Sequence, residues 1–314
     1  MADETLVRPP AHSEPATATP TDGSVSPPWI SLILATYGRS EELSVVLDSL
    51  VAQTETGFEV IVVDQNADDR LNKVLAAYAM LRIRHLKQSE PNLSLARNRG
   101  LEAAGGDWVA FPDDDCWYEP DCLFKVRHAL TSEKNLDGVV ATWVEVEGDK
   151  VRPMHDLALS AWRDFRGGDA SSITLFLRRE RVAEQAGFDT RIGVGQFFGA
   201  GEETDLVLRL LADHRRLRFL PEARVHHHFS QERPVLSKET WLSTLKRARG
   251  VGAIYAKHEL RLWVILRGLL APLINPLRTG QPLVGLVFGI ADVIGRCQGL
   301  LYWRRRSGNT DTTR

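Results

Sequence analysis

The sequence predicts an α/β fold built on a mostly parallel sheet that is flanked by helices. One observation is that short apolar runs, typical of buried strands, alternate along the chain with stretches that carry leucine and valine at helical spacing. The other is the length of each unit, because a strand, a helix and a further strand at these spacings form a right-handed crossover. Sheets built from such crossovers are mostly parallel and carry helices on both faces.

The first half of the chain is expected to alternate strictly between strands and helices. The strands are expected at residues 30–34, 58–63, 83–86 and 108–111. The helices are expected at residues 40–52, 71–79, 93–104 and 120–130, and the third stops at a Gly-Gly pair, a common C-terminal signal. Ligands bind at the carboxyl ends of the strands in such sheets, so Thr36, Asp64 and the aspartates at 113–115 are expected on one rim.

The second half is less regular. Strands are expected at residues 139–146 and 173–177, and a helix at residues 201–211. A short strand at residues 217–220 is followed by Pro221 and then by three consecutive histidines at 226–228. Neighbouring side chains of an extended segment point to opposite faces, so one or two of these histidines are expected to face the rim.

Composition limits the classes of protein that fit the chain. Its 314 residues are 43% hydrophobic and 25% charged, which is ordinary for a globular protein of one or two domains. The formal net charge of -2 gives no general attraction to nucleic acid. Three cysteines without a Cys-x-x-Cys pair predict a reducing compartment and neither a disulfide framework nor a zinc site. Residues 1–28, rich in Pro, Ala, Thr and Ser, are expected to be a disordered tail.

Residues 235–314 are expected to form a helical extension of a main domain at 29–234. Leu, Ile, Val and Trp dominate there, with Arg and Lys interleaved. The stretch 260–277 is broken by two arginines and two prolines, and the apolar stretch 282–294 is too short to span a bilayer. Apolar helices edged by arginine and tryptophan suit the surface of a membrane, and packing against the main domain or a second subunit is the alternative.

Three consecutive aspartates, at the end of the apolar run 108–111, are the strongest chemical signal. Carboxylates crowded at the mouth of a buried strand call for a compensating cation, and hard oxygen ligands select magnesium, manganese or calcium. A helix N-cap needs one aspartate and not three, so the metal is favoured. These aspartates are Asp113, Asp114 and Asp115.

Other polar residues leave two interpretations open when taken singly. Asp64 fits an Asx-turn or a carboxylate that binds a nucleobase or ribose. Glu202, Glu203 and Asp205 open a helix, where acids complement the helix dipole or supply a general base. The histidines fit metal ligands or a surface loop equally well.

The order of the motifs resembles that of family-2 glycosyltransferases. Residues 31–39, Gln53 and residues 59–64 resemble the opening of that family. Ala-Arg-Asn-x-Gly at 96–100 resembles its helix motif, and Phe-Pro-Asp-Asp-Asp at 111–115 resembles its Asp-x-Asp metal motif. Gly-Glu-Glu-Thr-Asp-Leu at 201–206 and the segment from Pro221 to the histidines resemble later blocks of the family. The resemblance covers roughly residues 30–229.

The resemblance implies a GT-A fold and an inverting transfer of sugar from a nucleotide-diphosphate donor, with magnesium or manganese bound. The donor would lie against a set of residues that follow the strand ends: Thr36, Arg39, Asp64, Arg97, Asp113 and Asp114. The family pattern makes Asp113 and Asp115 the outer metal pair, with His227 as the histidine of best spacing. Glu203 falls where the family's catalytic aspartate lies, and Glu202 beside it would serve the acceptor or the base.

Departures from the family refine these expectations. Gln65 stands where many relatives have a second aspartate, and Glu203 is one methylene longer than the family's aspartate. The Gln-x-x-Arg-Trp motif of processive synthases is not evident, which predicts transfer of a single sugar and not processive synthesis. The acceptor is expected to be a glycan or a lipid-linked molecule at the cytoplasmic face of the membrane. The alternatives are another nucleotide or nucleotidyl transferase and a non-catalytic membrane-surface scaffold with the same fold.

Overall fold

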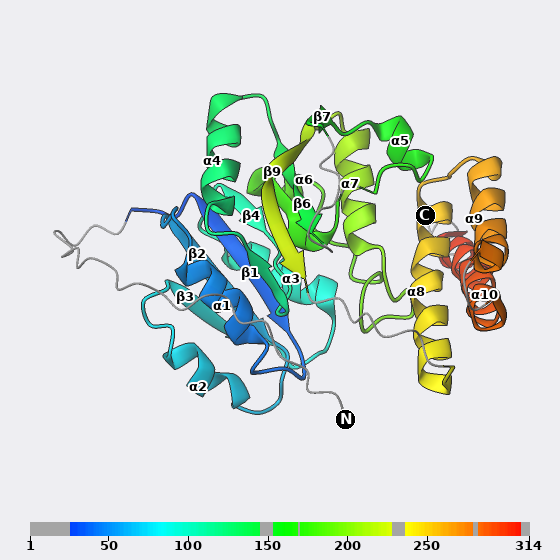
Figure 1. The fold of residues 1–314 in the computed structure, drawn as a ribbon, viewed down its shortest axis with the longest axis horizontal. Coiled ribbons are helices and arrows are strands. Elements are labelled where there is room, and N and C mark those ends of the chain that lie inside the picture. Colours follow the sequence, from blue (N-terminus) through cyan, green and yellow to red (C-terminus); the bar gives the residue numbers. More distant parts are fainter. Residues whose placement is uncertain (1–25, 145–152, 169, 228–235, 279–281, 309–314) are drawn as a thin grey trace.

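The computed structural model describes residues 26–144, 153–168, 170–227, 236–278 and 282–308 (Figure 1). Most of the expected tail at 1–28 therefore lies outside the described residues, and so does His228. A nine-stranded sheet runs through the molecule in the order β3-β2-β1-β4-β8-β6-β9-β5, and β7 pairs with β9 off this path. The strands are β1 (Ile30–Thr36), β2 (Phe58–Asp64), β3 (Ile83–Lys87), β4 (Trp108–Ala110), β5 (Cys116–Tyr118), β6 (Gly138–Val144), β7 (His155–Asp156), β8 (Leu175–Arg178) and β9 (Leu217–His227).

The strand directions divide the sheet into two parts. Strands β3, β2, β1 and β4 are parallel neighbours, as the alternation of strands and helices predicts. Beyond β4 the directions are mixed: β8 is antiparallel to both of its neighbours, while β6 and β9 are parallel. The predicted α/β class is confirmed, and its parallel part is the half that the regular alternation had indicated.

Helices cover both faces of this sheet. They are α1 (Leu43–Val51), α2 (Arg70–Ala76), α3 (Leu93–Ala103), α4 (Cys122–Ser132), α5 (Leu159–Arg163), α6 (Arg179–Glu184), α7 (Glu202–Ala212), α8 (Lys238–Lys257), α9 (Leu262–Ile274) and α10 (Pro282–Gly308), with short 3-10 turns at Ser172–Thr174 and Asn275–Arg278. Strand β1 shows how the faces are divided, because Leu32 and Leu34 join the core under α1 and α4, while Ile33 joins the core under α3 and α7. Each of these fully buried side chains contributes about 1.5–3 kcal/mol of hydrophobic free energy.

The register of the parallel strands places polar residues on one rim. Thr36 is paired with Asp64 at the ends of β1 and β2, and Leu32 is paired with Ala110 near the end of β4. The aspartates that follow β4 therefore emerge at the same edge of the sheet as Thr36 and Asp64. This part of the predicted arrangement is present in the structure.

Strand β9 is longer than the sequence indicated, and this brings the histidines to the rim. The strand was expected to end at residue 220, before Pro221, but it continues to His227. A shift in the pairing with β6, between Ala141 and Thr142, takes up the proline in an irregularity. Beyond it, the antiparallel pairing of Cys116 with His227 sets Asp115 beside that histidine.

The C-terminal helices stack outward from α7. Figure 1 shows α8 between α7 and the pair α9 and α10, which form the edge of the molecule. The expectation that the apolar stretch 282–294 is too short to span a bilayer is wrong for the helix that contains it. Within α10, the stretch Leu283–Arg305 is long and apolar enough to cross a membrane by length and composition, and few of its residues are buried. The division between a main domain and this extension stays a prediction.

Candidate active site

Two carboxylates and one imidazole form a cluster at the rim. One ligand atom from each of Asp113, Asp115 and His227 lies within 4.8 Å of the others. His227 Nε2 lies 3.0 Å from Asp115 Oδ1. Burial alone would raise the pKa of Asp115, but the hydrogen bond and charge of His227, together with Arg39, lower that pKa to about 2. This donor set suits a hard or borderline divalent cation such as magnesium or manganese.

The neighbouring histidine is turned away from this cluster. His226 Nε2 lies 3.1 Å from Glu119 Oε1, and its ring stacks on Trp117 with 5.2 Å between centroids. Adjacent side chains of β9 point to opposite faces, so only one of the two can meet the aspartates. Of His226 and His227, the structure brings His227 to the cluster. This is the histidine that the resemblance had singled out.

The middle aspartate holds the loop in place. Asp114 accepts a hydrogen bond of 2.6 Å from the Thr36 hydroxyl and another of 2.6 Å from Arg39 Nη1. The same Arg39 nitrogen donates to Asp115 Oδ2 at 2.5 Å. Asp114 is buried, whereas 41% of the Arg39 side chain is exposed. Thr36 and Arg39, both expected near the nucleotide, are thus connected directly to the aspartate loop.

Asp64 lies at the end of β2 and is fully buried. Its Oδ1 accepts two hydrogen bonds of 2.8 Å from the backbone and side-chain nitrogens of Asn66. Its Oδ2 lies 3.0 Å from His85 Nε2 and 2.9 Å from Lys87 Nζ. Burial alone would raise the pKa of Asp64, but these hydrogen bonds lower it. The carboxylate is therefore held ionised among three neighbours.

The sequence pattern did not identify these three neighbours of Asp64, although it carried a signal for His85 and Lys87. His85 and Lys87 alternate along β3 and so share one face, and Lys87 is paired directly with Asp64. Two polar residues at alternate positions of a predicted strand, next to the strand that ends in Asp64, were the signal that could have found them. Gln65, the departure from the family pattern, accepts a hydrogen bond of 2.7 Å from the Asn92 backbone nitrogen and so supports the start of α3.

Arg97 connects the aspartate loop to the acids that open α7. The guanidinium is 2% exposed; Nη2 donates to Asp113 Oδ1 at 3.0 Å and Nη1 donates to Glu202 Oε1 at 3.0 Å. Helix α3 presents it there because the Asn92 side chain caps the helix, accepting from Leu95 N at 3.0 Å. A buried arginine between two carboxylates fixes their separation and compensates their charge.

The acids at the start of α7 stand in different environments. Gly201 precedes them with a φ of +98°, a left-handed conformation that favours glycine. Glu202 is buried and paired with Arg97. Glu203 is partly buried and accepts a hydrogen bond of 3.2 Å from the Thr204 hydroxyl. Burial, followed by the negative charge of Glu202, raises the pKa of Glu203 to about 7. A carboxylate with such a pKa is suited to general-base chemistry near neutral pH.

Comparison with proteins of known sequence shows partial similarity to bacterial glycosyltransferases. The chain is 35% identical over 111 residues to the putative glycosyltransferase EpsH of Bacillus subtilis, covering 35% of this chain and 32% of EpsH. It is 30% identical to the amylovoran biosynthesis glycosyltransferase AmsB of Erwinia amylovora, covering 49% of this chain and 56% of AmsB. The matches with EpsH and with two uncharacterised glycosyltransferases, from Escherichia coli and Haemophilus influenzae, span 32%, 42% and 36% of those relatives.

Comparison with solved structures shows the fold. The TarS fragment 1-349 of S. aureus, in complex with UDP-GlcNAc, matches with a TM-score of 0.53 and 16% identity, over 88% of this chain and 92% of that chain. The mannosyltransferase PcManGT of Pyrobaculum calidifontis, in complex with GDP-Man and Mn2+, matches with a TM-score of 0.57 and 15% identity, over 92% of this chain and 76% of that chain.

A family profile matches a longer part of the chain than the 111 residues that align with EpsH. The profile described as "Glycosyl transferase family 2" covers residues 31–192, more than half of the chain. This range contains β1 from its second residue on, β2 to β8, the aspartate loop and Arg97. The chain belongs to glycosyl transferase family 2.

Proposed function

We propose that this protein transfers a single sugar from a nucleoside-diphosphate sugar to a glycan or lipid-linked acceptor, with inversion at the transferred carbon. The observation that carries the proposal is the bridge that the buried Arg97 makes between Asp113 and Glu202. It sets a cluster suited to a divalent cation next to a carboxylate suited to general-base chemistry, and a donor-dependent transferase needs both.

The donor would lie along the rim of the parallel strands. Asp64, fixed by Asn66, His85 and Lys87, would receive the nucleobase or ribose. Thr36 is paired with Asp64 and donates to Asp114, and Arg39 also donates to the aspartate loop. Proteins of the same fold hold UDP-GlcNAc, or GDP-Man with Mn2+, which supports a nucleotide-sugar donor for this chain. AmsB, an amylovoran biosynthesis enzyme by name, supports polysaccharide or glycoconjugate synthesis.

Asp113, Asp115 and His227 fit a divalent cation, because their ligand atoms converge and two of the three are carboxylates. When bound, the cation would neutralise charge that develops on the departing diphosphate. Arg97 adds a fixed positive charge that touches Asp113 and keeps the loop at its distance from α7. Preorganised charges of this kind stabilise a transition state without reorganisation during the reaction.

Glu203 would remove the proton from the acceptor hydroxyl as the new bond forms. Its raised pKa of about 7 makes it a stronger base than an ordinary glutamate while leaving much of it ionised at neutral pH. Glu202 is engaged by Arg97 and so would orient the start of α7 and the acceptor. A single base on the side opposite the leaving group corresponds to inversion, in contrast to the nucleophile of a retaining mechanism.

The outer helices would place the enzyme at the inner face of the cell membrane. Large apolar side chains are exposed along both outer helices: Leu262, Leu266, Leu270 and Ile274 on α9, and Leu283, Ile290, Ile294 and Leu301 on α10. The charged residues of α9, and of α10 as far as Trp303, are engaged within the protein: Arg267 with the Asp164 carbonyl, and Arg296 with Asp292 at 2.7 Å. An apolar surface edged by Arg304 and Arg305 suits anionic lipid headgroups.

Peripheral attachment fits the contacts of α10 better than a span. Trp303 is 6% exposed and packs edge-on against Phe198 at 5.3 Å between centroids, so the end of α10 is attached to the rest of the protein. A span would remove the helix from that contact. Flotation with anionic vesicles tests the surface: Leu266→Ser with Leu270→Ser should reduce binding, while Val51→Ser, an exposed apolar side chain on α1, should not. Equal flotation of the parent protein, the double variant and Val51→Ser would contradict attachment to the membrane through this surface.

A donor screen tests the transfer itself. Purified protein, a divalent metal and a panel of nucleoside-diphosphate sugars are incubated with membrane lipid extract or glycan acceptors, and the nucleotide product and the anomeric configuration of the sugar product are determined by NMR. The proposal predicts release of nucleoside diphosphate and an inverted glycoside. Release of sugar 1-phosphate would indicate transfer of the nucleotidyl group and not of the sugar, and nucleotide-sugar binding without turnover would indicate a scaffold.

A further inference from the structure

The segment that carries the two glutamates rests directly on α8. Gly199 N donates to the Lys246 carbonyl of α8 at 3.0 Å. The contact is closest at Gly250, where a Cβ atom would lie 1.8 Å from the carbonyl oxygen of Ala200. Only a glycine in α8 therefore allows this approach of the loop backbone. One turn further along α8, a Cβ on Gly201 would lie 3.2 Å from the Ile254 side chain.

A buried ionic cluster connects the first turn of α7 to the end of α8. Asp205 is fully buried, and its Oδ1 lies 2.7 Å from Lys257 Nζ and 2.9 Å from His258 Nε2. Its Oδ2 accepts from Arg209 of the same helix at 2.9 Å. Lys257 also contacts Asp189 at 2.7 Å. Asp205 is two residues beyond Glu203, so this cluster sets the axial position and rotation of the turn that carries the glutamates.

Helix α10 holds α8 in turn. A Cβ on Gly252 of α8 would lie 2.1 Å from the Arg296 carbonyl, and a Cβ on Gly299 of α10 would lie 2.0 Å from the Arg249 carbonyl. The two helix backbones are therefore in contact at two levels. Tyr302 and Trp303 of α10 also pack edge-on against Phe197 and Phe198, which lead into the loop, with 5.3 Å between centroids in each pair.

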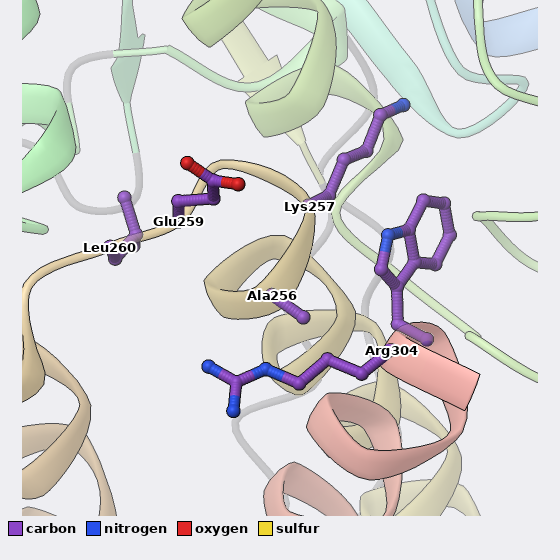
Figure 2. A pocket seen from close by; sticks show the side chains of 6 residues that line it. Ala256, Lys257, Glu259, Leu260 and Arg304 are labelled. Atoms are coloured by element: carbon purple, nitrogen blue, oxygen red, sulfur yellow. The ribbon is translucent and has the colours of Figure 1, made fainter. Parts of the chain in front are cut away.

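The positively charged side chains beside the cavity between the ends of α8 and α10 do not converge on a common ligand site. It has a volume of about 510 Å³ and is lined by Lys257 and Arg304 among others (Figure 2). Figure 2 shows the two side chains extending in different directions. The Lys257 ammonium is engaged by Asp189 and Asp205. Lys257 therefore serves the α7–α8 junction and not a ligand in the cavity.

We propose that α8 and α10 form a support that positions the catalytic glutamates, with Gly250, Asp205 and Lys257 as positioning residues. The inference rests on the proposed function, and it gives α8 and the end of α10 that packs on it, from Gly295 to Trp303, a role in the transfer in addition to a membrane attachment. Displacing reacting groups by about 1 Å lowers rates by roughly 100-fold, so a support of this kind acts on kcat. Donor binding depends on the rim at β1 and β2 and on the metal ligands, which are connected to α8 indirectly, through Glu202 and Arg97, so it should change far less than kcat.

A pair of matched glycine variants tests the proposal. Gly250→Ala forces α8 from the loop, with a clash of 1.8 Å, whereas Gly289→Ala makes a comparable clash, 2.1 Å from the Pro272 carbonyl, between α10 and α9 on the outer side. Gly250→Ala should lower kcat about 100-fold and Gly289→Ala less than about threefold. Both should bind UDP with Mn2+, or GDP where the donor screen selects it, within about twofold of the parent in calorimetry.

Two further measurements keep the test decisive. Lys257→Met should lower kcat, whereas Lys257→Arg should keep most of it, because arginine retains the cation between Asp189 and Asp205. This pair of variants tests the positioning role if Gly250→Ala does not fold. Hydrogen–deuterium exchange of peptides covering residues 197–205 should be faster in Gly250→Ala and unchanged in Gly289→Ala, whether or not a donor has been found.

The outcomes separate this inference from the proposed function. Absence of turnover in the parent protein, with the exchange difference present, would contradict the transfer and support the positioning role. Turnover in the parent with kcat unchanged in folded Gly250→Ala or Lys257→Met would overturn the positioning role alone. Equal loss of kcat and nucleotide affinity in both glycine variants would also overturn it, because it would show a general structural defect.

Discussion

Replacing Glu202 with glutamine should move the pH dependence of the reaction, because that carboxylate raises the pKa of its neighbour. Burial and the charge of Glu202 together raise the pKa of Glu203 from 4.5 to about 7. A base must be deprotonated to act, so kcat should fall as the pH drops below about 7, with roughly a tenth of the maximum left at pH 6. Glu202→Gln removes the charge but keeps an oxygen that Arg97 can reach.

The expected result of Glu202→Gln is an acidic limb shifted to lower pH. Burial still raises the pKa of Glu203, so the limb should stay above the ordinary value of 4.5. The assay is kcat under saturating donor and acceptor between pH 5 and 8.5, with metal in excess. Glu203→Gln should remove most of the turnover at every pH, by about 100-fold or more, as expected for loss of a general base.

Nucleotide affinity provides the control for this profile. Protonation of Asp113 or Asp115 would weaken metal and donor binding, and would therefore appear in the dissociation constant of the nucleoside diphosphate and not in kcat alone. Calorimetry over the same pH range separates the two. A profile without an acidic limb, or a limb that Glu202→Gln leaves at the same pH, would refute the assignment of Glu203 as the base.

Three further predictions concern stability and binding. Glu203→Gln should stabilise the fold above pH 7 by about 1–3 kcal/mol. The raised pKa of Glu203 in the folded state gives stability that is present below the unfolded-state pKa and is lost as the pH rises through 7, and glutamine does not undergo that loss. Thermal unfolding of both proteins at pH 4 and pH 8 checks this, and an equal stability difference at the two pH values would contradict it. Arg97→Met leaves Asp113 and Glu202 without their shared cation, and it should lower the free energy of unfolding in urea by about 3 kcal/mol or more. A decrease below about 1 kcal/mol would show that Arg97 is not buried between the two carboxylates in solution. Lys87→Met removes one of the groups that hold Asp64 and should weaken binding of the nucleoside diphosphate by about fivefold, with unchanged affinity arguing against Asp64 as part of the nucleotide site.

The parts of the fold that follow from local pattern were predictable. Strands β1 to β4 and helices α1 to α4 alternate because apolar periodicity changes between strand and helix along the chain, and that signal is local. Strand β5 was missed because a strand of three residues carries too little pattern. The continuation of β9 past Pro221 depends on pairing with β5 and β6, which are distant in sequence, so the local proline signal misled the prediction.

The length of α10 was hidden by its glycines and charges. Apolar composition weakens after residue 294, where Gly295, Arg296 and Gly299 follow. In the structure the helix continues, since the glycines allow the backbone of α8 to approach and Arg296 pairs with Asp292 one turn earlier. Residues that discourage an isolated helix are here the ones that allow two helices to pack closely.

The candidate site was predictable to the extent that its residues follow strand ends. Thr36, Arg39 and the aspartates share a rim because parallel strands end together, and the resemblance singled out His227 and Glu203. The different environments of the two glutamates were not predictable, because they arise from Arg97 on another helix and from burial by the folded chain. The same holds for Asp205, whose partners in α8 lie about fifty residues further along the chain.

Metal-dependent release of nucleoside diphosphate from the donor selected in the screen tests the central claim most directly. The parent protein is compared with Asp115→Ala and Glu203→Gln, with nucleotide binding measured for each. The account predicts that Asp115→Ala loses metal-dependent nucleotide binding and turnover together, while Glu203→Gln keeps the binding and loses turnover. Full turnover in both variants would contradict the account, because neither the metal site nor the base would then lie where the structure brings these residues together.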